Sequence, residues 1–263
     1  MGSPEFALPA LTALAALSEV AGVVTQPDRP AGRGRTLVPP PVKVLAQKLG
    51  LAVIQPERMR SPEAMDRLRS WQPDVIVVAA FGKILRPEVL SLPPLGCLNL
   101  HASLLPRHRG AAPIPAAILA GDTETGITLM KMDEGLDTGP ILAQKRIAVL
   151  PEDTAESLNR SLAGLAAETL QTFFPVYIRE GLTAVTQDDS RATYAPQLRK
   201  EDGRLDFHQS SEHLSRKVRA YHPWPGTFVL WKRQPLKVIE IEVESFQDAQ
   251  APGTVLEHGR FPA

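Results

Sequence analysis

The sequence predicts an α/β protein with a doubly wound, mostly parallel sheet, followed by a smaller β domain. Short apolar, β-branched segments alternate with segments of helical periodicity, which is typical of that class. Residues 75–80 form a continuous apolar run, as in a parallel strand that is buried on both faces. After about Arg199 short alternating segments with aromatic and β-branched residues replace the helices, and these indicate the β domain.

The elements follow from capping residues, apolar spacing and β-branched runs. In the first half we expect a helix capped by Ser3, a strand at 20–25, a helix at 42–49, a strand at 51–54, a helix at 62–71, and strands at 75–80 and 96–101. In the second half we expect a helix at 112–120, strands at 125–132 and 141–149, a long helix at 154–179, and short strands at 227–231 and 236–243. The domains expected from this order are 1–185, a linker at 186–204, and 205–263.

Composition excludes several classes of function. Lysine plus arginine and aspartate plus glutamate both number 29, so any contact with RNA must come from local basic patches. Cys97 is the only cysteine, which leaves no disulfide framework and no thiolate metal cluster. The sequence has no long apolar run, secretory leader, zinc motif or nucleotide-binding glycine loop. We therefore expect a cytoplasmic protein that uses no metal and contacts no membrane.

Residues 98–110 hold the densest group of chemically useful side chains. Asn99 and His101 lie two positions apart on a predicted strand, so their side chains project from the same face. A carboxamide can donate to a carbonyl oxygen and an imidazole can carry a proton near neutral pH, which suits acyl transfer through a tetrahedral intermediate. The alternative is a strand whose polar pair is satisfied by the backbone.

Three stretches together resemble a known family. Residues 99–114 and 132–139 are similar to the formyltransferases that use 10-formyltetrahydrofolate, and residues 25–35 resemble a loop of the branch that acts on methionyl-tRNA. The resemblance implies that 10-formyltetrahydrofolate is the co-substrate, that methionyl initiator tRNA is the acceptor, and that the protein is a monomer. It also implies an oligonucleotide-binding (OB-like) barrel as the second domain.

The same resemblance assigns roles to individual residues. It makes Asn99, His101 and Asp137 catalytic, with Asp133 and Glu134 as competitors for the acidic role that are more often turn-capping or solvated. The tetrahydrofolate-binding stretch consists of Ser103, Leu104, Leu105 and Pro106. The residues expected to bind tRNA are Arg33, Arg35 and Lys43, although a solvated surface loop is the alternative for that segment.

Both ends of the chain differ from the family pattern. The first strand is expected to be missing, because Met1 directly precedes the turn that this strand normally enters. The residues after 205 suffice for only part of a five-stranded barrel, so we expect an incomplete domain and a chain truncated at both ends. Two alternatives to methionyl-tRNA formylation remain open, namely formyl transfer to a small amine such as a sugar nucleotide or glycinamide ribonucleotide, and tRNA binding without catalysis.

Overall fold

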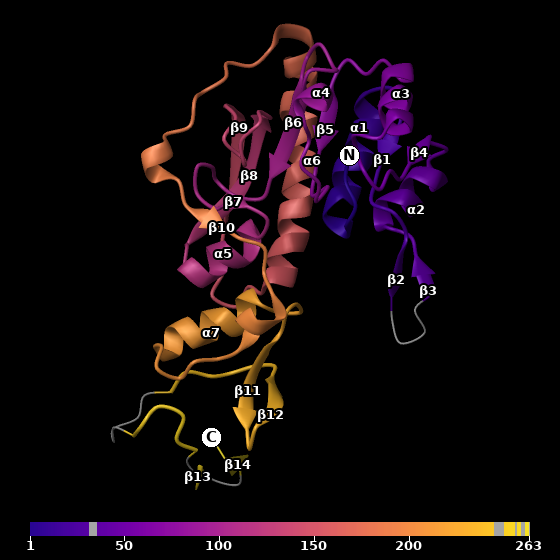
Figure 1. Ribbon diagram of the computed structural model, residues 1–263. Helices are drawn as coiled ribbons and strands as arrows, with labels where there is room; N and C mark the ends of the chain where they lie inside the picture. Colours follow the sequence, from indigo (N-terminus) through magenta and orange to yellow (C-terminus); the bar gives the residue numbers. More distant parts are fainter. Residues whose placement is uncertain (32–35, 245–249, 256, 259–260, 263) are drawn as a thin grey trace.

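The structure of the protein is a computed structural model that describes residues 1–31, 36–244, 250–255, 257–258 and 261–262 (Figure 1). The helices are α1 (Leu8–Leu17), α2 (Pro41–Lys48), α3 (Pro62–Ser70), α4 (Pro87–Leu90), α5 (Pro113–Ala120), α6 (Ala155–Glu180) and α7 (Ser211–Ala220). The strands are β1 (Val23–Val24), β2 (Arg29–Ala31), β3 (Thr36–Val38), β4 (Val53–Ile54), β5 (Ile76–Val78), β6 (Cys97–His101), β7 (Arg109–Gly110), β8 (Glu124–Lys131), β9 (Ile141–Ala148), β10 (Tyr194–Ala195), β11 (Thr227–Trp231), β12 (Gln234–Val238), β13 (Glu257–His258) and β14 (Phe261–Pro262).

The central sheet has four strands in the order β5-β6-β8-β9. β5 and β6 are parallel, but β6 pairs with β8 and β8 with β9 in antiparallel register. The expectation of a mostly parallel sheet is therefore wrong, and the sheet is mixed. The physical reason lies in β9, where Lys145 and Arg146 make a half-solvated strand that a buried parallel sheet would not accept.

The first two residues join two sheets. The pair β1-β4 is parallel and forms a sheet of its own, and Gly2 lies between it and β5, with its N–H donating to the Val24 carbonyl at 3.1 Å. On the other side the α-ammonium of Met1 donates to the Val77 carbonyl at 2.6 Å, and Gly2 forms a parallel bridge with Ala79. Next to this bridge is a cavity of about 1000 Å³, which is lined by β1, β5, α1 and the end of α6.

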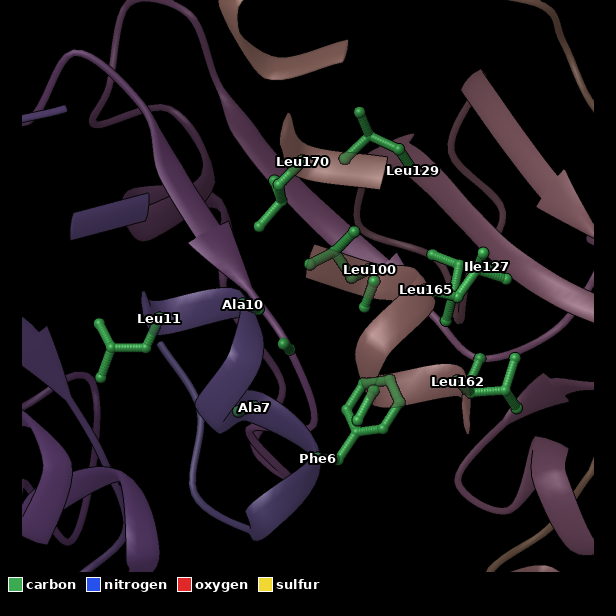
Figure 2. Packing of buried hydrophobic residues seen from close by; sticks show 14 of the residues in the cluster. Phe6, Ala7, Ala10, Leu11, Leu100, Ile127, Leu129, Leu162, Leu165 and Leu170 are labelled. Atoms are coloured by element: carbon green, nitrogen blue, oxygen red, sulfur yellow. The ribbon is translucent and has the colours of Figure 1, made fainter. Parts of the chain in front are cut away.

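The main hydrophobic core lies between the central sheet and α6, the long helix that runs down the middle of Figure 1 beside β8 and β9. Figure 2 shows α6 side chains such as Leu162 and Leu170 among residues of the sheet, including Leu100 and Leu129. These four side chains are at most 2% exposed. Helix α1 packs on α6 beside them, so the layer of helices on this face fixes the position of β6.

Of two helix starts predicted from the sequence, the one at Thr154 is confirmed and the one at Ser3 is not. Thr154 caps α6 in a reciprocal capping box with Ser157, so the long helix begins where the sequence predicted. Ser3 does not cap a helix, because its hydroxyl accepts hydrogen bonds from the Gln26 N–H and the Thr25 hydroxyl instead. A short 3-10 turn at Glu5–Ala7 precedes α1.

The C-terminal region contains α7 and two hairpins. Sequence reasoning missed α7, although Ser210 accepts from the His213 N–H as its N-cap and Leu214 and Val218 are buried on one face. The strands β11-β12 and β13-β14 form separate two-stranded sheets. In the described part of this region there is no closed barrel, so the OB-like barrel is not seen. None of the helices described has the length and apolarity needed to cross a membrane.

Candidate active site

The two polar residues of β6 lie where the sequence placed them, on one face of a central strand. Burial along β6 is almost complete, and Asn99 is the one partly exposed position. Neighbouring strands hold β6 on both sides, because Asn99 pairs in register with Val78 of β5 and Met130 of β8. The period of two directs Asn99 and His101 to the same side, and both side chains reach the same carboxylate.

That carboxylate belongs to Asp137, in the loop between β8 and β9. Its Oδ2 accepts the Gly110 N–H at 2.8 Å and lies 3.5 Å from His101 Nδ1. Its Oδ1 lies 3.4 Å from Asn99 Nδ2, a long hydrogen bond. The Asp137 side chain is 14% exposed, so these interactions are shielded from most of the solvent. Asn99 and His101 of β6 and Asp137 of the β8-β9 loop, almost 40 residues further along the chain, thus converge.

The second nitrogen of His101 also faces an oxygen. Nε2 lies 2.9 Å from the His108 carbonyl, which can only accept, so Nε2 carries the proton. Proton exchange at this ring is therefore left to Nδ1, the nitrogen beside Asp137. Both neighbours are satisfied fully only by the doubly protonated imidazolium, which is suited to hold a proton transiently.

The stretch expected to bind folate forms a tight loop after β6. Ser103 and Leu105 are buried, and Leu104 and Pro106 are partly exposed. The Ser103 hydroxyl donates to the Arg107 carbonyl at 2.6 Å, which holds it within the loop. Only the partly exposed members of the stretch therefore present surface at this point.

Buried hydrogen bonds fix the same loop to the sheet. The Thr128 hydroxyl donates to the Ser103 carbonyl at 2.6 Å and accepts the Leu105 N–H at 3.1 Å. Gln144 donates to the Leu105 carbonyl from the next strand at 3.0 Å. The loop is thus a rigid wall beside Asn99 and His101.

The two competing acids occupy the same loop as Asp137 but do not reach the other polar groups. Asp133 is exposed and accepts the Gly135 N–H at 3.1 Å and the Thr138 hydroxyl at 2.8 Å. Glu134 is also exposed. Asp133 therefore acts as the turn-forming residue, and Asp137 is the acid that faces His101.

Of the three cations expected to bind tRNA, one can be placed. Arg33 and Arg35 lie outside the described residues; in the sequence they fall between the two strands of the hairpin β2-β3. Lys43 lies at the base of that hairpin, where its ammonium is 2.6 Å from the Asp28 carboxylate. Hydrogen bonds from Gln55 and Lys43 lower the pKa of Asp28. Lys43 is thus engaged within the protein.

Sequence reasoning missed the segment that follows α6, expected only as a linker. β10 pairs with β7 in parallel, and the Thr193 hydroxyl accepts the His108 N–H at 2.8 Å. The buried guanidinium of Arg109 contacts Asp189 at 2.7 Å. Burial works to lower the pKa of Arg109, but hydrogen bonds to Asp189 and Tyr194 outweigh it and the pKa is raised. These contacts join residues about 80 positions apart, for which the sequence carries no local signal.

Comparison with known proteins identifies the family. The formyl transferase family model matches residues 7–173, and the model of the formyl transferase C-terminal domain matches residues 197–260. This chain belongs to the formyltransferase family. The methionyl-tRNA formyltransferase of Myxococcus xanthus is 49% identical to it over 259 residues, which cover 98% of this chain and 82% of that protein. That of Geobacter metallireducens is 46% identical and covers 99% of this chain and 83% of its own length.

Solved structures share the fold of this formyltransferase. The N-formyltransferase of Helicobacter canadensis, solved in complex with folinic acid and dTDP-3-aminofucose, superposes with a TM-score of 0.70 at 16% identity, over 99% of this chain and 92% of that one. The methionyl-tRNA formyltransferase of Clostridium thermocellum gives a TM-score of 0.59 at 18% identity, over 77% of this chain and 87% of that one. The fold is thus the Rossmann-like α/β fold of formyltransferases, with mixed sheets.

Proposed function

We propose that this formyltransferase transfers the formyl group of 10-formyltetrahydrofolate to the α-amino group of methionyl initiator tRNA, for translation initiation. The observation that carries the proposal is the convergence of Asn99, His101 and Asp137, in a chain 46 to 49% identical to methionyl-tRNA formyltransferases over nearly its whole length. The three groups match the needs of acyl transfer in number and in chemical type.

The first step is attack of the methionyl amine on the formyl carbon, which places negative charge on the formyl oxygen. Asn99 donates one N–H to Asp137 and retains a second for that oxygen. Because Asn99 is partly buried and held in register between two strands, this donor needs little reorganisation as the charge develops. Such preorganised donors contribute about 3 to 4 kcal/mol when they face a developing oxyanion.

The second task is proton transfer. The attacking amine must lose one proton and the N10 nitrogen of the folate must gain one as its bond to carbon breaks, so a single carrier can serve both. His101 Nδ1 is the nitrogen left for this exchange because Nε2 donates to the His108 carbonyl, and the neighbouring Asp137 carboxylate stabilises the imidazolium that forms in between. Asp137 therefore orients the ring and balances its charge.

We assign the binding of the two substrates to two different parts of the chain. We place the folate against the loop of Ser103, Leu104, Leu105 and Pro106, whose partly exposed apolar members suit a planar ring. We place the tRNA acceptor end against Arg33 and Arg35, with Lys43 fixing the base of their hairpin through Asp28. The domain division at 1–185 and 205–263 stays part of this proposal, and it is compatible with the two matched family models.

A small amine acceptor is the main competing reading. The solved sugar formyltransferases share the fold, but at 16 to 18% identity they carry no argument about the acceptor. The relatives from Myxococcus xanthus, Geobacter metallireducens and Sorangium cellulosum, which are 46 to 49% identical to this chain, are methionyl-tRNA formyltransferases. No feature of the described residues favours a sugar nucleotide over the tRNA.

Formyl transfer from 10-formyltetrahydrofolate is the direct test, with methionyl initiator tRNA and a dTDP-amino sugar offered separately. We expect turnover with the tRNA alone, and a fall in kcat of about 10²-fold or more in Asn99→Ala and His101→Ala. Turnover with only the sugar nucleotide would show that the acceptor is a small amine and not the tRNA. Binding of tRNA with no turnover by the unmodified protein would reject catalysis.

A further inference from the structure

The segment after α6 runs back across the loop that carries Asp137. Val185 pairs with Ile141 at the start of β9, and each donates its N–H to the other's carbonyl at 2.8 Å. Two residues later Gln187 turns inward and is only 7% exposed, between exposed neighbours. The strand pairing therefore fixes where this one side chain enters the protein.

The side-chain amide of Gln187 is bonded at both ends. Its Oε1 accepts from Arg109 Nε at 3.0 Å and from a terminal guanidinium nitrogen at 2.8 Å. Its Nε2 donates to the Asp137 carbonyl at 2.8 Å and to the Gly139 carbonyl at 2.7 Å. The two acceptor contacts with a guanidinium assign the amide orientation, since the opposite orientation would place N–H groups against N–H groups.

The loop that Gln187 holds needs an external restraint. Asp137 has φ +54°, a left-handed conformation that costs a non-glycine residue about 1 kcal/mol or more. Glycines at 135 and 139 flank it, which adds backbone freedom around the strained residue. The Gly110 N–H holds the Asp137 carboxylate, and Gln187 holds its carbonyl, so the residue is fixed from both sides.

We propose that Gln187 is a positioning residue for formyl transfer, which holds Asp137 at His101 by clamping the backbone of residues 137–139. The inference rests on the proposed function, because it gives Gln187 a role through Asp137. Gln187 does not touch the three polar groups of the site, and Arg109 in turn fixes the orientation of Gln187. A buried amide bonded to two loop carbonyls resists the sub-ångström displacement that formyl transfer would not tolerate.

The variant Q187E keeps the contact of this side chain with Arg109 and removes its hydrogen bonds to the loop carbonyls. A glutamate has nearly the same shape and keeps the contact with Arg109 as an ion pair, so the fold is expected to persist. It has no N–H to donate, and its carboxylate would repel the carbonyls of Asp137 and Gly139. The matched control is Q209E, the same change at an exposed position away from the site.

We expect Q187E to lower kcat by roughly 10- to 100-fold while the KM values for folate and tRNA stay within about twofold, and Q209E to match the unmodified enzyme. We also expect faster hydrogen exchange at the amides of residues 135–139 in Q187E. A kcat within about twofold of the unmodified enzyme, or unchanged exchange in this loop, overturns the proposal.

The two proposals can fail separately. If the unmodified protein transfers no formyl group to tRNA, the proposed function fails, while the exchange measurement still tests the clamp. If Q187E does not fold, Q187M repeats both measurements with an uncharged side chain of the same length. Normal exchange and normal kcat in Q187M would then overturn the role of Gln187.

Discussion

Replacing Asp137 by asparagine tests the catalytic geometry most sharply. The change keeps the size of the side chain but removes its charge and replaces one acceptor by a donor. In one orientation of the new amide, its oxygen accepts from the Gly110 N–H and its amino group faces the amino group of Asn99. In the opposite orientation its oxygen accepts from Asn99 and its amino group faces the Gly110 N–H, so two donors meet in either case. Either orientation breaks the arrangement that brings His101 and Asn99 together.

The loss can be sized from one distance. At 3.5 Å between His101 Nδ1 and Asp137 Oδ2, an imidazolium and a carboxylate attract by about 5 kcal/mol at an effective dielectric constant of about 20. Since about 1.4 kcal/mol corresponds to one decade in rate, the loss of that charge predicts a decrease of about three decades. We therefore expect kcat to fall by about 10²- to 10⁴-fold in Asp137→Asn.

Steady-state formyl transfer to methionyl-tRNA measures this effect, and the same loop offers the control. Asp133→Asn makes the same chemical change in an exposed residue that can still accept from Gly135 and Thr138 through its remaining oxygen. We expect its kcat to stay within about threefold of the unmodified enzyme. Equal losses in the two variants would refute the assignment of Asp137, and an unchanged Asp137→Asn enzyme would refute the charge-balancing role.

Two further predictions concern the α-amino group of Met1 and the expected tRNA contact at Arg33. Burial lowers the pKa of the Met1 α-ammonium from 8.0 to about 6. Between these two pH values the unfolded chain binds more protons than the folded protein, so the free energy of unfolding rises with pH. The total rise is about 2 to 3 kcal/mol. Urea titrations from pH 5.5 to 8.5 test this, and Nα-acetylated protein showing the same rise would contradict it. Arg33→Ala should raise the KM for tRNA while the KM for folate stays unchanged; an equal rise in both would exclude Arg33 from the tRNA site.

Elements that depend on local pattern could be predicted from the sequence. Helix α3 and strand β6 were expected within a residue of their observed ends, because capping, apolar spacing and β-branched runs act over short distances. The shared face of Asn99 and His101 was predictable for the same reason, since side-chain direction along a strand depends only on its period. The direction of β8 and β9 could not be predicted so directly, because strand pairing is a long-range choice.

The contacts that complete the site lie beyond such reasoning. Asp137 was selected by resemblance, because nothing local distinguishes it from Asp133 in the same glycine-containing loop. The distinction appears only when the loop folds onto Gly110 and the two residues acquire different partners. Gln187 gave no signal at all, since its partners lie about 50 and 80 residues away along the chain.

The segment after α6 therefore has a role in both halves of the site. Through Thr193 it holds the backbone at His108, whose carbonyl fixes the tautomer of His101. Through Gln187 it holds the backbone at Asp137, which faces the other nitrogen of the same ring. Both partners of the imidazole thus depend on one stretch of chain that contacts neither His101 nor Asn99. A displacement of this segment would shift Asp137 and the backbone partner of His101 at the same time, and so disturb the contact between the two side chains. Its effect on kcat should therefore exceed its effect on the binding of either substrate.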